Sequence, residues 1–230
     1  MKLKLSLAML LSTAGLLAAS SAEAHFGVAS GPAFANKTQK VVFSAGHGCD
    51  GLDTFAVRIQ IPAGVTSVRP LNSDFGMTGV EKNAEDAIVA VSWQKPVEEV
   101  LDSDISYYEL AVRMKVPDKP FTMMYFPVTQ TCRAADGTLT VVEWNALPGQ
   151  MGEPAAALTV LPARLPGWNK YSNNEHIDDP SIFFQDATIV WKGSAAYSFN
   201  PAIVDLIKAT EGVTELTDGI HPDDEIWVLY

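Results

Sequence analysis

The chain has 230 residues and a formal net charge of −11, with 27 acidic and 16 basic side chains. This balance argues against a nucleic-acid partner, whose phosphates would be repelled, and against anionic membrane surfaces. It is compatible with cation binding, although many exported proteins are acidic for solubility alone.

The first 24 residues have the pattern of a secretory signal peptide. Lys2 and Lys4 precede an apolar run over residues 5–18, and residues 22–24 (AEA) form an A-x-A cleavage site. The apolar run is too short for an ordinary transmembrane helix, and no later segment approaches the required length. We therefore expect an exported, periplasmic protein without a membrane span, whose mature chain begins at His25.

The chain has two cysteines, Cys49 and Cys132. A pair of cysteines in an oxidising compartment most often forms a disulfide. The alternative is a two-thiolate copper or zinc site, but neither cysteine has a Cys or Met partner at ligand spacing. The pattern favours the disulfide.

Short strands separated by turns fill the chain from His25 to about Pro162. No convincing amphipathic helix lies between them, which favours an all-β fold built as an antiparallel sandwich. The predicted strands are residues 40–43, 54–61, 87–93, 107–116, 122–129 and 139–144.

The character of the sequence changes after Leu165. Residues 166–180 are polar and turn-rich, and are predicted to be a linker or long loop. The rest is predicted to be a small β-α-β extension, too short to bury a core of its own and therefore packed on the sandwich. Its elements are a strand at 187–191, a helix at 200–209 with Ile203, Leu206 and Ile207 on one face, and a strand at 225–230.

An amino-terminal histidine would be a strong copper ligand. His25 would offer its α-amine and its imidazole Nδ1 to the same ion, closing a favourable chelate ring. Adjacent nitrogen donors, with oxygen donors completing the plane, suit Cu(II), which heads the affinity series for such ligands. Chance alone also places a histidine after a cleavage site in a few per cent of cases, so this signal is suggestive by itself.

Several motifs, in this order, resemble the YcnI-like copper-binding proteins. The resemblance runs from residue 24 to residue 162 and includes both cysteines. It rests on residues 24–28 (AHFGV), 46–51 (GHGCDG), 57–65 (VRIQIPAGV), 116–118 (VPD), 125–132 (YFPVTQTC) and 143–144 (EW).

The resemblance implies an immunoglobulin-like sandwich that holds one Cu(II) in a single-histidine brace. His25 matches the brace histidine and Trp144 the tryptophan that covers the metal. The carboxylate ligand is Asp50 or Asp53, with Asp50 preferred. The resemblance also implies a Cys49–Cys132 disulfide, a domain over residues 25–163 and an extension over 164–230.

The chain departs from this family at residues 74–77 (DFGM), where many relatives carry a Pro-Gly-Trp turn, and in its extension, which shorter relatives lack. Other interpretations also stay open. Trp144 could be a core residue, and His47 could be a second ligand or a residue that stabilises a turn. The acidic surroundings of His176 and His221 are typical of solvated loops.

The sequence contains no recognised catalytic motif. We therefore expect a copper-binding protein, not an enzyme, that buffers copper or transfers it to other exported copper-handling proteins. Two alternatives remain: a copper-dependent oxidase acting on polysaccharides, with His47 completing the brace, and a metal-free sandwich used for protein interaction.

Overall fold

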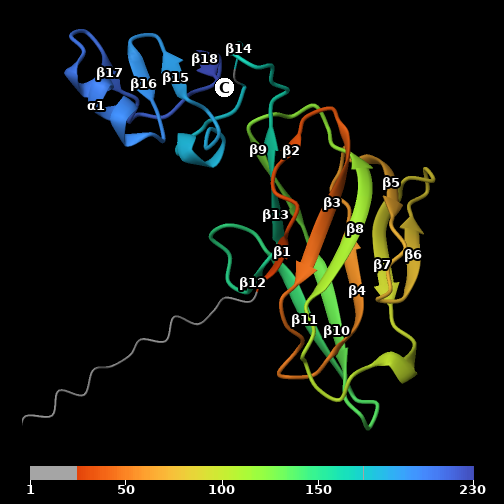
Figure 1. The fold of residues 1–230 in the computed structure, drawn as a ribbon. Helices are drawn as coiled ribbons and strands as arrows, with labels where there is room; N and C mark the ends of the chain where they lie inside the picture. Colours follow the sequence, from red (N-terminus) through yellow and green to blue (C-terminus); the bar gives the residue numbers. More distant parts are fainter. Residues whose placement is uncertain (1–24, 173) are drawn as a thin grey trace, which may run out of the picture.

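The computed structural model describes residues 25–172 and 174–230, so the predicted signal peptide lies outside the described residues. The chain forms an elongated β-sandwich with a smaller unit at one end (Figure 1). The strands of the sandwich are β1 (Phe26–Val28), β2 (Ala33–Phe34), β3 (Thr38–Ala45), β4 (Thr54–Gln60), β5 (Thr66–Pro70), β6 (Met77–Lys82), β7 (Ile88–Gln94), β8 (Tyr108–Lys115), β9 (Thr122–Phe126), β10 (Val128–Arg133), β11 (Leu139–Ala146), β12 (Glu153–Pro154) and β13 (Ala156–Leu161). A short 3-10 helix, Val97–Glu99, follows β7.

The strands pair mainly antiparallel in three sheets. Their orders are β1-β3-β8-β5, β12-β11-β10-β4-β7-β6 and β2-β13-β9. The all-β, antiparallel sandwich predicted from the sequence is confirmed.

Alternating apolar residues place the core between the sheets. In β8, the buried residues Leu110, Val112 and Met114 alternate with residues that are more exposed. Phe43 from β3 meets Phe126 from β9 edge-on, with ring centroids 5.1 Å apart. Burial of each such side chain contributes roughly 1.5–3 kcal/mol, so this alternation fixes which face of each strand points inward.

The predicted strand at residues 122–129 is two strands, β9 and β10. Pro127 separates them, and proline cannot donate to a strand ladder. β9 pairs with β13, whereas β10 pairs with β4 and β11, so the chain changes sheets at this proline.

The extension is larger than the predicted β-α-β unit. Its five strands form one sheet in the order β14-β18-β15-β16-β17. The predicted linker at 166–180 is wrong over its first part, because β14 pairs there with the last strand, β18. The elements are β14 (Trp168–Ser172), β15 (Ile189–Lys192), β16 (Ala195–Tyr197), α1 (Pro201–Ala209), β17 (Thr214–Glu215) and β18 (Glu225–Leu229), with a 3-10 helix at Pro180–Ile182.

The helix α1 lies where it was predicted. The side chain of Asn200 accepts a hydrogen bond from the Ala202 amide at 3.0 Å, and Pro201 begins the helix. Ile207 is buried, but Leu206 is 64% exposed, so the predicted apolar face is wrong at Leu206. Among the described residues, no helix is long and apolar enough to cross a membrane.

A shared apolar cluster joins the extension to the sandwich. Phe121, which precedes β9, packs its ring against Tyr171, Phe183 and Phe184, with centroids 5.7, 5.9 and 5.5 Å away. Leu161, at the end of β13, belongs to the same cluster. The extension therefore has a core that is completed by residues of the sandwich.

Candidate functional site

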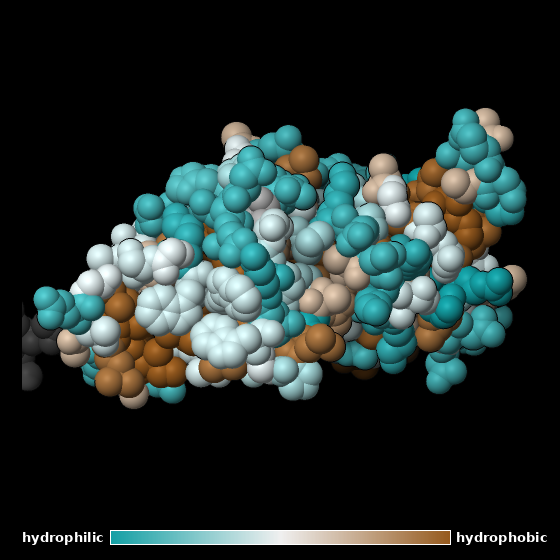
Figure 2. Space-filling model, turned by 90° about the horizontal axis from the view of Figure 1, so that it is seen from above, coloured by the Kyte–Doolittle hydropathy of each residue, from teal (hydrophilic) through white to brown (hydrophobic). Residues whose placement is uncertain are grey.

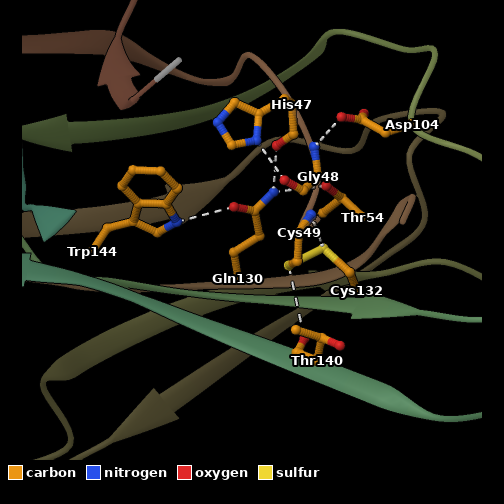
Figure 3. The surroundings of a disulfide bond; sticks show 9 residues. All are labelled: His47, Gly48, Cys49, Thr54, Asp104, Gln130, Cys132, Thr140 and Trp144. Carbon is orange, nitrogen blue, oxygen red and sulfur yellow. Dashed lines mark hydrogen bonds between the residues drawn. A yellow bond between two sulfur atoms is a disulfide. The ribbon is translucent and has the colours of Figure 1, made fainter. Parts of the chain in front are cut away.

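A disulfide anchors the loop that follows β3. Cys49 and Cys132 are bonded, with Cα atoms 5.7 Å apart, and both residues are almost fully buried (Figure 3). The predicted disulfide is confirmed, and the alternative of a two-thiolate metal site is excluded. The bridge ties residues 46–52 to the central strand β10.

Trp144, on β11, is held in position by a buried glutamine. Its indole nitrogen donates to the Gln130 side-chain oxygen at 2.9 Å. The Gln130 amide nitrogen donates in turn to the carbonyl oxygen of His47 and to the Thr54 hydroxyl, both at 2.8 Å. Gln130 is fully buried and Trp144 is 4% exposed, so this network links the indole directly to the loop of His47 (Figure 3).

Two imidazoles meet this indole. The ring centroid of His25 lies 6.2 Å from that of Trp144, and the centroid of His47 lies 6.1 Å from it, both in edge-on geometry. The pairing of β1 with β3 explains part of this arrangement, because Phe26 lies opposite Ala45 and the chain continues from there to His25 and to His47. The structure thus brings together two predicted site residues, His25 and Trp144, and the alternative second ligand, His47.

The backbone sets the orientation of the His47 ring. Its Nδ1 lies within hydrogen-bonding distance of the Gly48 carbonyl oxygen. A ring nitrogen must donate to a carbonyl, so in the neutral imidazole this contact places the proton on Nδ1 and leaves Nε2 as the atom with a lone pair. Nε2 is therefore the atom through which His47 could bind a metal.

Gly48 allows the backbone of the loop that carries His47 to pack closely against Leu52. Its amide donates to the Asp104 carboxylate at 2.6 Å, and a Cβ at this position would lie 1.7 Å from the carbonyl oxygen of Leu52. Only glycine fits there without moving the backbone. Asp104 is a carboxylate beside the site that the sequence did not single out, because it is distant from the loop along the chain.

Asp53 has a structural role. Its carboxylate is fully buried and accepts hydrogen bonds from Lys95 Nζ and the Tyr108 hydroxyl, both at 2.6 Å, and from the Leu101 amide at 2.9 Å. Phe75, in the segment that departs from the resembled family, packs edge-on against Tyr108 with centroids 5.0 Å apart. Because both oxygens of Asp53 are engaged, the structure does not support it as a metal ligand.

Asp50 is the exposed carboxylate of this loop. It lies in the turn from Cys49 to Leu52, with a positive φ of 51°. The Leu52 amide closes the turn on the Cys49 carbonyl at 3.0 Å. The turn thus holds the Asp50 main chain next to the disulfide and leaves its carboxylate in solvent.

In the part of the chain that the structure describes, side chains alone do not form a metal-binding cluster. Over residues 25–172 and 174–230, no three or more His, Cys, Asp or Glu side chains are grouped so as to hold a metal ion. A metal site beside Trp144 would therefore need donors other than such a cluster, and an amino-terminal α-amine is one.

The family model described as "Domain of unknown function (DUF1775)" matches residues 25–160. The chain belongs to this family. DUF1775 is the domain found in YcnI-like proteins. The match covers the sandwich and stops before the extension. No curated protein matches the chain.

Solved structures resemble part of the chain. An uncharacterised protein from Nocardia farcinica with an immunoglobulin-like fold aligns with a TM-score of 0.50 and 24% identity, covering 60% of this chain and 98% of that one. The sandwich is therefore immunoglobulin-like. A cohesin–dockerin complex from Clostridium thermocellum also aligns, with a TM-score of 0.37, 12% identity and coverage of 60% and 98%.

Proposed function

We propose that this DUF1775 protein is exported and binds one Cu(II) through His25 as the first residue of the mature chain. The observation that supports the proposal most is the edge-on contact between His25 and Trp144. A brace of this kind takes its α-amine and imidazole from a single residue, so it does not require the cluster of three side chains that the described residues lack.

The donor set suits Cu(II). Two nitrogens from His25 would occupy adjacent positions, and carboxylate or water oxygens would complete the coordination. Asp50 is the solvent-exposed carboxylate of the neighbouring loop, whereas Asp53 is occupied by Lys95 and Tyr108. We therefore assign the oxygen ligand to Asp50.

The indole of Trp144 would lie beside the ion in a fixed orientation. Its ring is buried and its nitrogen is bonded to Gln130, so it cannot turn away without breaking that hydrogen bond. A fixed indole excludes water from one side of the site, and a face turned to the ion would attract it electrostatically. His25 itself is only half-buried, so the other side stays open to solvent. An open coordination sphere favours exchange, and we propose copper buffering in the periplasm or transfer to other exported copper-handling proteins.

One observation favours a second candidate function. His47 contacts the same indole as His25, and its Nε2 is the ring atom left for a metal. Two histidines on one copper are the ligand set that a copper-dependent oxidase acting on polysaccharides would need. The alternative of a metal-free interaction sandwich predicts that neither histidine matters for binding copper.

Two variants separate these functions. Electron paramagnetic resonance and calorimetry would follow the Cu(II) titration of His25→Ala and His47→Ala, each beginning at residue 25. The proposal expects His25→Ala to lose tight one-to-one binding and His47→Ala to keep it. Loss in both variants would favour the oxidase ligand set, and unchanged weak binding in both would leave the metal-free sandwich.

A further inference from the structure

Three of the five tryptophans lie on one face of the extension. They come from three consecutive strands of its sheet: Trp168 from β14, Trp227 from β18 and Trp191 from β15. Trp191 is paired with Trp227, and Lys170, two residues after Trp168, is paired with Trp227 on the other side. Paired residues, and residues two apart on a strand, share a face, so the three indoles point the same way.

This face is not the one that packs inside the extension. The intervening residues of the same strands, Val190, Ile226 and Val228, are fully buried. Trp168 and Trp227 are instead 52% and 44% exposed. The three indoles line a shallow hollow, which we call the tryptophan platform. Seen from above, hydrophobic (brown) and intermediate (near-white) residues lie among hydrophilic (teal) ones on the surface of the extension (Figure 2).

A salt bridge between Lys170 and Glu225 lies at the rim of the platform. Lys170 Nζ lies 5.6 Å from the Trp227 ring centroid and pairs with Glu225 at 2.5 Å. Glu225 also accepts a hydrogen bond from the Trp227 indole nitrogen at 3.3 Å. The hydrogen bond from Lys170 lowers the pKa of Glu225 below its ordinary value, so this carboxylate stays ionised beside Lys170. The rim therefore offers donors and acceptors without a local net charge.

The charges around the platform disfavour nucleic acids and cationic ligands, and its small size disfavours a protein partner. Proteins that stack nucleobases on aromatic rings do so in a positively charged groove, whereas this chain has a net charge of −11 and Lys170 is already paired. A cationic ligand would meet Lys170 over the face of Trp227. A stable protein interface covers about 800 Å² on each partner, far more than three side chains bordered by charges provide.

An uncharged polysaccharide is the ligand class that suits both the exposed indoles and the paired charges at the rim. The flat face of a pyranose ring presents C–H bonds, whose partial positive charge is attracted to the negative face of an indole. Its equatorial hydroxyls lie at the ring edge, where Lys170 and Glu225 could donate and accept hydrogen bonds. Neighbouring strands are about 4.8 Å apart, and Trp168 is displaced by two residues, about 7 Å, along β14 from Lys170, the residue paired with Trp227. The outer two tryptophans therefore lie roughly 12 Å apart on a diagonal, which suits an extended chain of sugar rings.

We infer that the tryptophan platform formed by Trp168, Trp191 and Trp227 binds β-1,4-linked neutral polysaccharides. This inference is independent of the copper proposal, since the platform lies beyond the DUF1775 match. It assigns the extension a role in attaching the sandwich to a glycan surface.

The test uses the whole mature chain. Retention on insoluble cellulose and on chitin would be measured with EDTA present, for the unmodified protein, Trp168→Ala, Trp227→Ala and the double variant. Phe199→Ala is the matched control, because Phe199 is an aromatic residue of the extension that is 60% exposed and outside the platform. Thermal unfolding by circular dichroism would establish that each variant is folded.

We expect retention on at least one of the two polymers, weakened about tenfold or more by each tryptophan substitution and unchanged in Phe199→Ala. The tryptophan fluorescence of the unmodified protein should also change on addition of the matching soluble hexasaccharide. Retention of the folded double variant equal to that of the unmodified protein would overturn the inference. The absence of retention on both polymers would also overturn the inference. The same holds if the platform binds a proline-rich peptide and neither polymer.

Discussion

The imidazole of His25 meets the indole of Trp144 edge-on, with ring centroids 6.2 Å apart and ring planes at 78°. Trp144 lies on β11, which pairs with β10, whereas His25 immediately precedes β1, which pairs with β3 in a different sheet. Gln130 holds the indole through its side-chain oxygen and holds the His47 carbonyl through its amide nitrogen. The position of the candidate copper site therefore depends on one buried glutamine, and this dependence can be tested.

Replacing Gln130 by alanine should disturb both stability and copper binding. The substitution removes hydrogen bonds to Trp144, His47 and Thr54 and leaves buried polar groups unpaired, which costs about 1–3 kcal/mol per group. Urea unfolding should show a loss of at least about 2 kcal/mol, and Cu(II) affinity should fall. Thr131→Ala, on the same strand but only half-buried, is the control. Unchanged affinity in folded Gln130→Ala would show that the site does not depend on the hydrogen bonds of Gln130 to Trp144 and His47.

Asp53 should matter for stability and not for copper. Asp53→Asn leaves Lys95 as a buried charge without its ion-pair partner, which typically costs 3–5 kcal/mol. Lys95→Met should cost a similar amount, and a double-mutant cycle would show strong coupling between the two positions. One-to-one Cu(II) binding should persist in Asp53→Asn and weaken in Asp50→Asn. The opposite ranking of these two variants would make Asp53 the ligand.

Removal of the disulfide should strongly destabilise the sandwich. The bridge joins residues 83 positions apart, and the chain-entropy model gives a contribution of about 4–5 kcal/mol for a loop of this length. Urea unfolding of the Cys49→Ser/Cys132→Ser variant should show a loss of this order. A loss below about 1 kcal/mol would mean that the sheets alone fix the loop of His47.

The exposed pair of Arg58 and Glu81 should give a small, pH-dependent contribution. Two hydrogen bonds of 2.7 Å join them, and the bond from Arg58 lowers the pKa of Glu81 below its ordinary value. A lowered pKa in the folded state adds stability above the unfolded pKa, and this stability is lost as the pH falls through the folded value. Glu81→Gln should therefore cost less than about 1 kcal/mol at pH 7 and nothing in strong acid. An equal cost at both pH values, measured by urea unfolding, would contradict this account.

The sequence predicted the class of the fold well because its alternating strands carry the core. In β8 the buried residues Leu110, Val112 and Met114 alternate with more exposed ones, and β4 shows the same alternation over its second half. The predicted ranges match both strands closely. Strands β1, β2, β5, β6, β12, β13, β14, β16 and β17 lie outside the predicted strand ranges. Of these, β6 is an exposed edge strand, and β14 carries polar residues whose pairing with β18 is visible only in the fold.

The site was only partly predictable. The choice between Asp50 and Asp53 depended on Lys95 and Tyr108, which are far away in the sequence but surround Asp53 in the structure. The role of Gln130 was also hidden, since a glutamine in a strand gives no signal until its partners are known. In the same way, three separated tryptophans became a platform only through the order of the strands in the extension.

If His25 binds copper as an amino-terminal residue, as we propose, a residue placed before it should abolish binding. The most direct measurement compares protein beginning at His25, verified by mass spectrometry, with protein carrying one extra glycine before it. Cu(II) binding would be followed by electron paramagnetic resonance and calorimetry at pH 7.5, and again at pH 5, where protonation of the α-amine should compete with the metal. We expect tight one-to-one binding with nitrogen couplings, which weakens in acid and is lost when the glycine is added. Equal binding by the two proteins, or no binding by either, would contradict it.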